Sequence, residues 1–405
     1  MSTTETEPTD VTGPEAHGTS APEPPKAPKL AKDGKVRTLR AAQLPKIAPA
    51  LVAVASVVAA VVITLVVSDG FNIALAAFLA GIINFIAILT WSGVVEGMRK
   101  ATDRVATTLV TSSFVLACIP LVSLLWLTLS NGLPVLLENS SVLTRTMQGM
   151  TGSLDQGYAN GETGLMGGFY HATIGTLLIT LAASIISIPI GLLTAIYLVE
   201  YGGKTALGRG ITFLVDVMTG IPSIVAGLFA FSLFSTVLSW ISPALMANAK
   251  MGFSAAVALS VLMIPVVVRN AEEILRLVPD DLREASYALG VPKWKTIVKI
   301  VLPTSVSGIL SGITIAIARV IGETAPIMVT AGFAKNLNFN LFDGWMSSLP
   351  TFIYDSAMRP VSPGVASFAS AERAWAAALV LILIVMVLNV IARVIAKLLA
   401  PKAGR

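Results

Sequence analysis

Residues 280–303 read DDLREASYALGVPKWKTIVKIVLP, and this polar stretch decides the fold assignment. It lies between two long apolar runs, at 252–270 and 304–332. Each run is long enough to cross a bilayer as a helix, which takes about 20 apolar residues. The polar stretch is therefore expected to be a loop on one side of a membrane, from which the rest of the chain can be oriented.

The composition of the whole chain also indicates a membrane protein. Of its 405 residues, 55% are hydrophobic and 13% are charged, whereas a soluble protein carries about 25% charged residues. So few charges would not cover the surface of a soluble enzyme of this size. A single cysteine, Cys118, excludes a disulfide framework and a cysteine metal cluster, and two histidines leave little material for a histidine metal site.

Eight apolar runs are long enough to span a bilayer. They cover residues 47–68, 72–95, 106–129, 172–198, 210–241, 252–270, 304–332 and 374–400. Gly220 and Pro222 interrupt the run 210–241, which is expected to be kinked or partly re-entrant. These runs predict an all-α polytopic membrane protein of about eight transmembrane helices.

Positive charge orients these spans. If the N-terminus is cytoplasmic and eight spans alternate, the outer loops 130–171, 242–251 and 333–373 hold five of the 28 Lys and Arg residues. This bias follows the positive-inside rule, so both termini are expected in the cytoplasm. It also explains the net charge of +5 better than binding to nucleic acid does. Residues 1–45, rich in Pro, Ser, Thr and Glu, are expected to form a disordered cytoplasmic tail, and 401–405 a second, short one.

The polar stretch itself predicts two short helices joined by a turn. Asp281 is expected to cap the first helix, with Glu284 completing a capping box. Gly290 fits the position that ends this helix, and Pro292 fits the first turn of the next. The second helix, about 293–301, is amphipathic and basic. The pair is expected to lie along the inner membrane face.

The spacing of Glu284-Ala285-Ser286, Gly290 and Ile300-x-Leu302-Pro303 resembles the EAA loop of ABC-importer permeases, with Ser286 where Ala is common. In that family the loop forms a coupling helix that docks into a groove of the cytoplasmic ATPase subunit. The resemblance implies an ABC importer permease fold, and the alternative is an ordinary amphipathic interfacial helix. The coupling residues that it implies are Glu284, Ala285, Gly290, Pro292, Leu302 and Pro303.

The chain carries no phosphate-cradling loop of its own. Gly203-Lys204-Thr205 resembles the end of a Walker A motif, but the first glycine of that motif would fall at Leu198. We therefore expect this chain to bind no cofactor. ATP and Mg²⁺ would be bound by the partner ATPase.

The span after the loop contains a charged pair within ITIAIARVIGETAPIMVTAG, residues 313–332. Arg319 and Glu323 are four residues apart, which places them on one face of a continuous helix. An arginine within the bilayer costs about 2.5–3.5 kcal/mol on insertion scales, so Arg319 is expected to be paired and to face protein or an aqueous path. Arginine also suits bidentate contact with an oxyanion. The residues alone leave open a transport role and a structural ion pair.

The stretch 317–326, together with the polar loop, is similar to the A-type permease subunit of phosphate-specific ABC importers. The resemblance covers roughly 103–400, the permease domain. It implies import of inorganic phosphate across the cell (plasma) membrane by alternating access, with no covalent chemistry by this chain. Asp216, in the interrupted run, would line the path or satisfy freed backbone groups. The candidate pathway residues are Arg319, Glu323, Thr324 and Asp216.

The resemblance also implies partners. They are a second permease subunit of the C-type, a dimer of ATP-binding subunits and an extracytoplasmic phosphate-binding protein, besides membrane lipid. The family pattern has six spans, and this sequence adds two N-terminal helices within 46–102. The alternatives are an ABC permease for another oxyanion (molybdate, sulfate or phosphonate), an ion-coupled secondary transporter, and a membrane scaffold without transport activity.

Overall fold

The computed structural model describes residues 44–45, 47–67, 72–203 and 205–399. The tails expected at 1–45 and 401–405 lie outside these ranges, apart from Leu44 and Pro45. The described residues form helices and connecting segments without a strand, and eight of the helices are long and apolar enough to cross a membrane. The all-helical, eight-span expectation is therefore confirmed. The chain divides into two compact units, Met1–Cys118 and Ile119–Arg405.

The first unit contains a helical hairpin. Its helices are α1 (Ala48–Val67), α2 (Ile73–Glu96) and the first part of α3 (Met98–Glu138). Every fourth residue of α1 from Ala48 to Thr64 is buried, and these residues are mostly small, so α1 packs closely against α2. Gly97, at φ +88°, makes the tight turn between α2 and α3. Beside this turn, Arg104 donates to both carboxylate oxygens of Glu96 at 2.5 and 2.8 Å.

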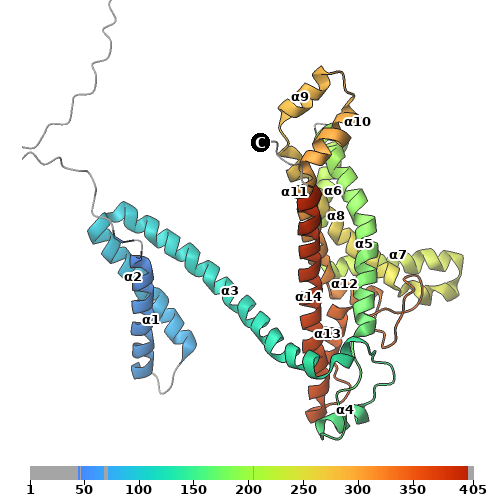
Figure 1. Ribbon diagram of the computed structural model, residues 1–405, viewed down its shortest axis with the longest axis horizontal. Helices are drawn as coiled ribbons and strands as arrows, with labels where there is room; N and C mark the ends of the chain where they lie inside the picture. The colour runs from blue at the N-terminus through green and yellow to red at the C-terminus, as the bar shows by residue number, and fades with distance from the viewer. Residues whose placement is uncertain (1–43, 46, 68–71, 204, 400–405) are drawn as a thin grey trace, which may run out of the picture. The chain divides into compact units, whose positions relative to one another are not determined.

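The second unit is a bundle of long helices that packs around α8 (Figure 1). These helices are α5 (Tyr170–Ile196), α6 (Ala206–Thr219), α7 (Ser223–Ile241), α8 (Gly252–Arg276), α11 (Leu302–Ile321) and α14 (Ser367–Leu399). The core that α8 shares with α5 and α11 contains Ile179, Leu259 and Ala316, all fully buried. Small residues bring the helices together, because a Cβ at Gly191 of α5 would lie 2.7 Å from Cγ1 of Val267.

Two of the expected spans are broken. The run 210–241 is interrupted at Gly220–Pro222, as predicted, and α7 then leaves the bundle crosswise to α14 (Figure 1). The run 304–332 was expected to be continuous, and this expectation is wrong. Helix α11 ends at Ile321, and a short helix, α12 (Ala325–Thr330), follows. Pro326 explains this break, because it has no N–H to donate to the carbonyl of residue 322.

One end of the second unit is closed by a compact cap, which we name the outer cap. It consists of residues 139–169 with η1 (Ser140–Leu143) and α4 (Gly152–Ala159), then α13 (Leu349–Met358), η5 (Gly364–Ala366) and the start of α14. Figure 1 shows α4 at the opposite end of this unit from α9 and α10. The buried side chains of the outer cap form a hydrophobic cluster that includes Val142, Phe169 and Leu349.

A buried ion pair holds the outer cap together. Arg373 of α14 is fully buried, and its two terminal nitrogens donate to Oδ1 and Oδ2 of Asp155 at 2.9 and 2.6 Å. A third hydrogen bond reaches the Met166 carbonyl at 2.9 Å. Nearby, Tyr158 donates to Glu372 at 2.7 Å, and burial, followed by this hydrogen bond, raises the pKa of Tyr158 to about 12. The phenol therefore stays protonated as a donor at physiological pH.

We predict that Asp155→Ala will destabilise the protein by about 3–5 kcal/mol, because it leaves the guanidinium of Arg373 buried without a counter-ion. Thermal unfolding of the purified protein would measure the loss. The control is Asp355→Ala, which breaks an i,i+4 pair with the 60% exposed Arg359 and is expected to cost about 0–1 kcal/mol. Equal shifts in Tm for the two variants would contradict the prediction.

Candidate functional site

The polar stretch 280–303 forms a helical hairpin at the end of the second unit that lies opposite the outer cap (Figure 1). Its first helix is α9 (Asp280–Ala288), and its second is α10 (Lys293–Thr296). A π-helical turn, η4 (Ile297–Val301), then leads directly into α11. We call the segment from α9 to η4 the hairpin.

The turn of the hairpin is a Schellman motif centred on Gly290. This glycine has φ +74°, its N–H donates to the Tyr287 carbonyl at 2.9 Å, and the Val291 N–H donates to the Ser286 carbonyl at 3.2 Å. These are the two hydrogen bonds that define the motif, with Gly290 at the C′ position. The predicted end of the first helix is therefore confirmed.

The start of the first helix differs from the prediction. Helix α9 begins at Asp280, and its N-cap is Pro279, which makes no side-chain cap hydrogen bond. Asp281 thus lies inside the first turn, where it cannot act as a cap, and the capping box with Glu284 is wrong. The two acidic residues of this turn, Asp280 and Asp281, still stabilise the positive end of the helix dipole.

The second helix is also different, because it is continuous with the following span. Pro292 is its N-cap, one position before the predicted first turn. Pro303 lies in the first turn of α11, where its ring would clash with the carbonyl of residue 299 in an unbroken α-helix. The π turn widens the helix at this point, and the Leu302 N–H donates to the carbonyl of Ile297, five residues back. The second helix of the hairpin therefore runs into α11 without a loop between them.

Arg283 attaches the hairpin to the bundle, and the sequence analysis did not single it out. Its guanidinium donates five hydrogen bonds, although only 12% of the side chain is exposed. Two reach Glu200 Oε1, at 3.0 and 3.1 Å, in the π-helical segment η2 (Tyr197–Gly202) that follows α5. Others reach the carbonyls of Leu275, in the last turn of α8, and of Val278, just after this helix, at 3.0 and 2.6 Å. The hairpin is thereby fixed to the ends of α5 and α8.

Three further contacts join the two helices of the hairpin to each other and to η2. The buried hydroxyls of Ser286 and Thr296 hydrogen-bond each other at 2.8 Å, which joins α9 to α10. Lys293 donates to the Glu200 carbonyl oxygen, and its ammonium lies 4.9 Å from the centroid of the Tyr201 ring. Both helices of the hairpin are therefore linked to η2.

The opposite face of the hairpin is exposed and partly apolar. Leu289 is 84% exposed, Trp294 62% and Tyr287 40%, and Glu284 and Ala285 are exposed beside them. Large apolar side chains exposed at such a position mark a surface that another protein or the membrane covers. The coupling role predicted for Glu284 and Ala285 is compatible with this position.

Arg319 lies in the last turn of α11 and is exposed. Within the described part of the chain it has no hydrogen bond or ion pair, so its predicted pairing with Glu323 is wrong. The physical reason is that α11 ends at Ile321 and Glu323 lies in the link before α12. Glu323 therefore does not lie one helical turn above Arg319, as it would in a continuous helix. Glu323 and Thr324 are half-buried in this link.

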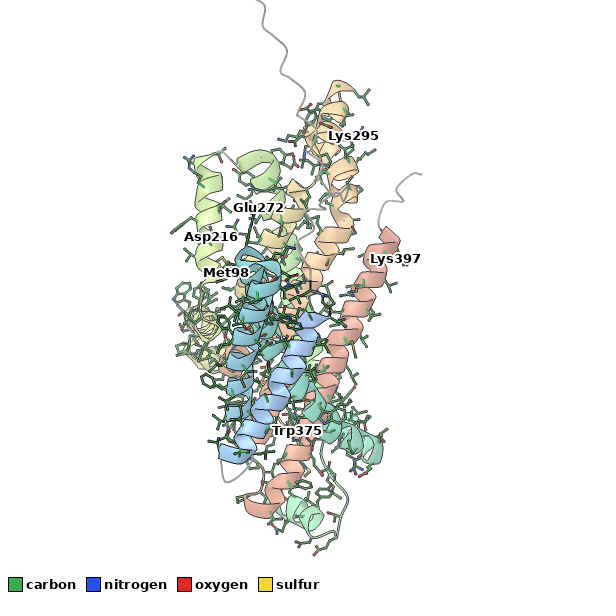
Figure 2. The ribbon with its side chains drawn as sticks, turned by 90° about the vertical axis from the view of Figure 1, so that its left-hand side faces the viewer. Met98, Asp216, Glu272, Lys295, Trp375 and Lys397 are labelled. Carbon is green, nitrogen blue, oxygen red and sulfur yellow. The ribbon has the colours of Figure 1, made fainter. Side chains whose placement is uncertain are left out.

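Asp216 belongs to a line of charges that connects α6 to α8. It accepts a hydrogen bond from Arg269, which also donates to Glu272 at 2.9 Å, and Arg276 donates to the other oxygen of Glu272 at 2.5 Å. Figure 2 labels Asp216 and Glu272, the carboxylates that flank Arg269. Asp216 is 59% exposed and Arg269 38%, so both are accessible in this chain. Asp216 therefore binds the side chain of Arg269. Arg269 is a candidate site residue that the sequence analysis missed.

The two charged positions lie at different levels of the bundle. Asn270, next to Arg269, packs against Gly312 of α11, where an added Cβ would lie 2.6 Å from the Cβ of Asn270. Arg319 is seven residues, or two turns, beyond Gly312, which places it about 10 Å farther from the hairpin. The structure thus shows Arg319 and Asp216 on separate levels. The described residues contain no group of His, Cys, Asp and Glu side chains that could hold a metal ion.

The sequence and the structure of this chain were compared with those of known proteins. The family model described as "Binding-protein-dependent transport system inner membrane component" matches residues 187–405. The chain is 47% identical over 297 residues to the phosphate transport system permease protein PstA 1 of Mycobacterium tuberculosis strain H37Rv, which covers 73% of this chain and 88% of that protein. It is 39% identical over 256 residues to PstA of Yersinia pestis, with 63% and 81% covered.

Among solved structures, the MetNI methionine ABC transporter in an inward-facing conformation resembles the chain with a TM-score of 0.43 and 18% identity. The match covers 56% of this chain and 94% of that one.

We predict that Arg283→Ala will loosen the hairpin. Hydrogen bonds from a charged group contribute about 1.5–3 kcal/mol, so amide exchange in α9 should accelerate by about tenfold or more. Hydrogen exchange read by mass spectrometry would measure it. Arg276→Ala is the control, because Arg276 is 65% exposed, bonds Glu272 alone among the described residues and lies outside the hairpin. Unchanged amide exchange in α9 of the Arg283→Ala variant would show that Arg283 does not hold the hairpin against the bundle.

Proposed function

Because the chain belongs to the family of inner membrane components of binding-protein-dependent transport systems, we propose that it is the permease subunit of an ATP-driven importer of inorganic phosphate. The similarity to phosphate permeases supports the substrate. The structural observation that carries the proposal is Arg319, an exposed cation in an apolar helix that has no acidic partner within the described residues.

Arg319 has the chemistry that a phosphate path requires. A guanidinium exposed to hydrocarbon is costly, so its exposed side faces water or another subunit in the assembled transporter. The planar fork of donors binds two oxygens of a phosphate at once. Without a carboxylate bound to it, the guanidinium keeps these donors available for a passing anion. Glu323 and Thr324, in the link that follows, border the same position.

Asp216 and Arg269 form a second station on the proposed path, nearer the hairpin. Arg269 is already bound to two carboxylates, so an arriving anion competes with Asp216 for its donors. This competition weakens the binding of the anion to Arg269, which suits a transporter because a bound anion must also be released. The order of the two stations, from Arg319 to Arg269, follows the direction of import.

Coupling to ATP uses the hairpin. Its exposed apolar face, around Leu289 and Trp294, docks on a dimer of ATP-binding subunits in the cytoplasm, which bind ATP and Mg²⁺. Closure of that dimer moves the hairpin, and Arg283 together with η4 passes the motion to α5, α8 and α11. This chain performs no covalent chemistry and binds no cofactor in the proposal.

The remaining partners follow from the same arrangement. A second permease subunit of the C-type completes the path, and an extracytoplasmic phosphate-binding protein delivers the anion to the outer cap. The chain lies in the cell (plasma) membrane, with both termini and the hairpin in the cytoplasm.

The chemistry of Arg319 also suits molybdate, sulfate or phosphonate, which makes a permease for another oxyanion the second candidate.

Arg319→Gln is predicted to reduce phosphate uptake to background while the transporter still assembles, because glutamine remains polar but loses the positive charge and the guanidinium fork. Uptake of labelled phosphate by the reconstituted complex measures this. Arg99→Gln is the control, since Arg99 is an exposed arginine of α3 that lies in the first unit. Normal uptake by Arg319→Gln would exclude a pathway role.

Stronger inhibition of the native complex by molybdate or sulfate than by unlabelled phosphate would favour the other oxyanion.

Gly290→Val is predicted to uncouple or detach the ATPase, because valine strains the backbone at φ +74° by about 1–2 kcal/mol. Co-purification of the ATPase and phosphate-dependent ATP hydrolysis would measure the effect. Gly364→Val is the matched control, with φ +72° and open space around its Cα, at the other end of the unit. It should produce the same strain without loss of coupling. Unchanged coupling in Gly290→Val would remove the hairpin from the proposed mechanism.

A further inference from the structure

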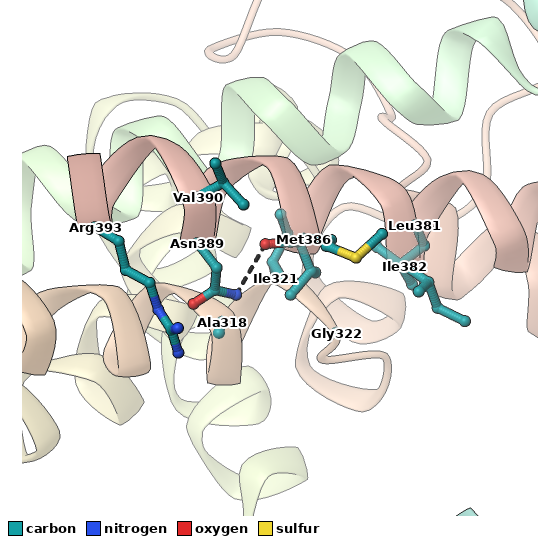
Figure 3. Close-up of a pocket in the computed structure, with 10 residues that line it drawn as sticks. Ala318, Ile321, Gly322, Leu381, Ile382, Met386, Asn389, Val390 and Arg393 are labelled. Atoms are coloured by element: carbon teal, nitrogen blue, oxygen red, sulfur yellow. Dashed lines mark hydrogen bonds between the residues drawn. The ribbon is translucent and has the colours of Figure 1, made fainter. Parts of the chain in front are cut away.

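A groove of about 590 Å³ runs between α11 and α14 (Figure 3). Ile382, Met386, Asn389 and Arg393 form a stripe along α14, at spacings of four, three and four residues, and Ala318 of α11 lies opposite. The groove is apolar except for Asn389 and Arg393. The Asn389 amide donates to the Val385 carbonyl at 2.8 Å, so its own helix satisfies this donor.

The charge of the groove is concentrated at one end. Arg393 is exposed, and no carboxylate bonds its guanidinium in the ranges that the structure describes. Helix α14 runs from the outer cap toward the hairpin end, as Trp375 and Lys397 show in Figure 2. Arg393 therefore marks the hairpin end of the groove, and Leu381 and Ile382 mark the other.

The length of the groove matches one leaflet of a bilayer. Leu381 and Arg393 are 12 positions apart, or about 18 Å along the helix, and half of the hydrocarbon core is about 15 Å. A transmembrane helix of another subunit would need a groove along the whole core. A lipid of the leaflet on the hairpin side needs an apolar channel of this length with a cation at the headgroup level, and basic sites between helices on that side bind anionic headgroups.

We propose that the groove between α11 and α14 binds an anionic phospholipid. The acyl chain lies along Ile382, Met386 and Ala318, and the headgroup phosphate is bound by Arg393. The inference does not depend on which anion the transporter carries. Because the lipid fills the space between α11, which bears Arg319, and α14, its occupancy stabilises one packing of these two helices.

The test uses the full-length chain, purified in the assembly that it forms and titrated with phosphatidylglycerol or with phosphatidylcholine of the same acyl chains. Native mass spectrometry counts the lipids that remain bound. We expect a retained phosphatidylglycerol, bound about fivefold more weakly by Arg393→Gln, which is the effect of losing one cation near an anionic surface. Lys397→Gln is the matched control, because Lys397 lies one turn farther along α14 and does not line the groove.

A second variant separates the groove from general surface charge. Ala318→Phe fills the apolar part and should remove the retained lipid while Arg393 stays in place. Loss of affinity in Arg393→Gln and Ala318→Phe, with Lys397→Gln unchanged, supports the site. Equal weakening by the two charge variants, equal retention of the two lipids, or a cross-link from Met386→Cys to another subunit in place of a bound lipid would each overturn it. A complex of the same subunit stoichiometry as the wild type, measured by native mass spectrometry, shows that a variant has assembled.

Discussion

The hydrocarbon core of a bilayer offers no hydrogen bonds and little stabilisation to charge, so an ionised side chain in a span needs a partner or access to water. Some charged side chains near the spans meet this requirement locally: Glu96 has Arg104, and Asp216 has Arg269. Arg319 does not, within the residues described. Paired charges therefore have a structural role, whereas the unpaired guanidinium of Arg319 remains available to a ligand. The proposed function follows from this difference.

Much of the fold was predictable because it depends on local rules. The apolar runs gave the eight spans, Gly220 and Pro222 gave the interruption before α7, and Gly290 gave the end of α9 through its positive φ. The site and the outer cap were less predictable, because their important contacts join residues far apart in sequence. Arg283 meets Glu200 across 83 positions, Arg269 meets Asp216 across 53, and Arg373 meets Asp155 across 218. A single sequence contains no signal for such pairs.

The error over Arg319 and Glu323 has a different cause. The i,i+4 rule holds for a continuous helix, and the sequence already contained Pro326, which removes a hydrogen bond from the ladder at residue 322. Weighing this proline more heavily would have ended α11 before Glu323. The broken helix also has a functional value in the proposed mechanism, because it separates the carboxylate from the guanidinium.

The π turn at 297–301 leaves room for Pro303 at the start of α11. A π turn contains one more residue than an α turn, so deleting a residue here would restore an ordinary helix. The ring of Pro303 would then clash with the carbonyl four residues before it. The angular phase of α11 would change little, because a π turn fits its extra residue into about the same rotation about the helix axis as an α turn. In evolution, therefore, the length of this short segment is constrained by the proline that follows it.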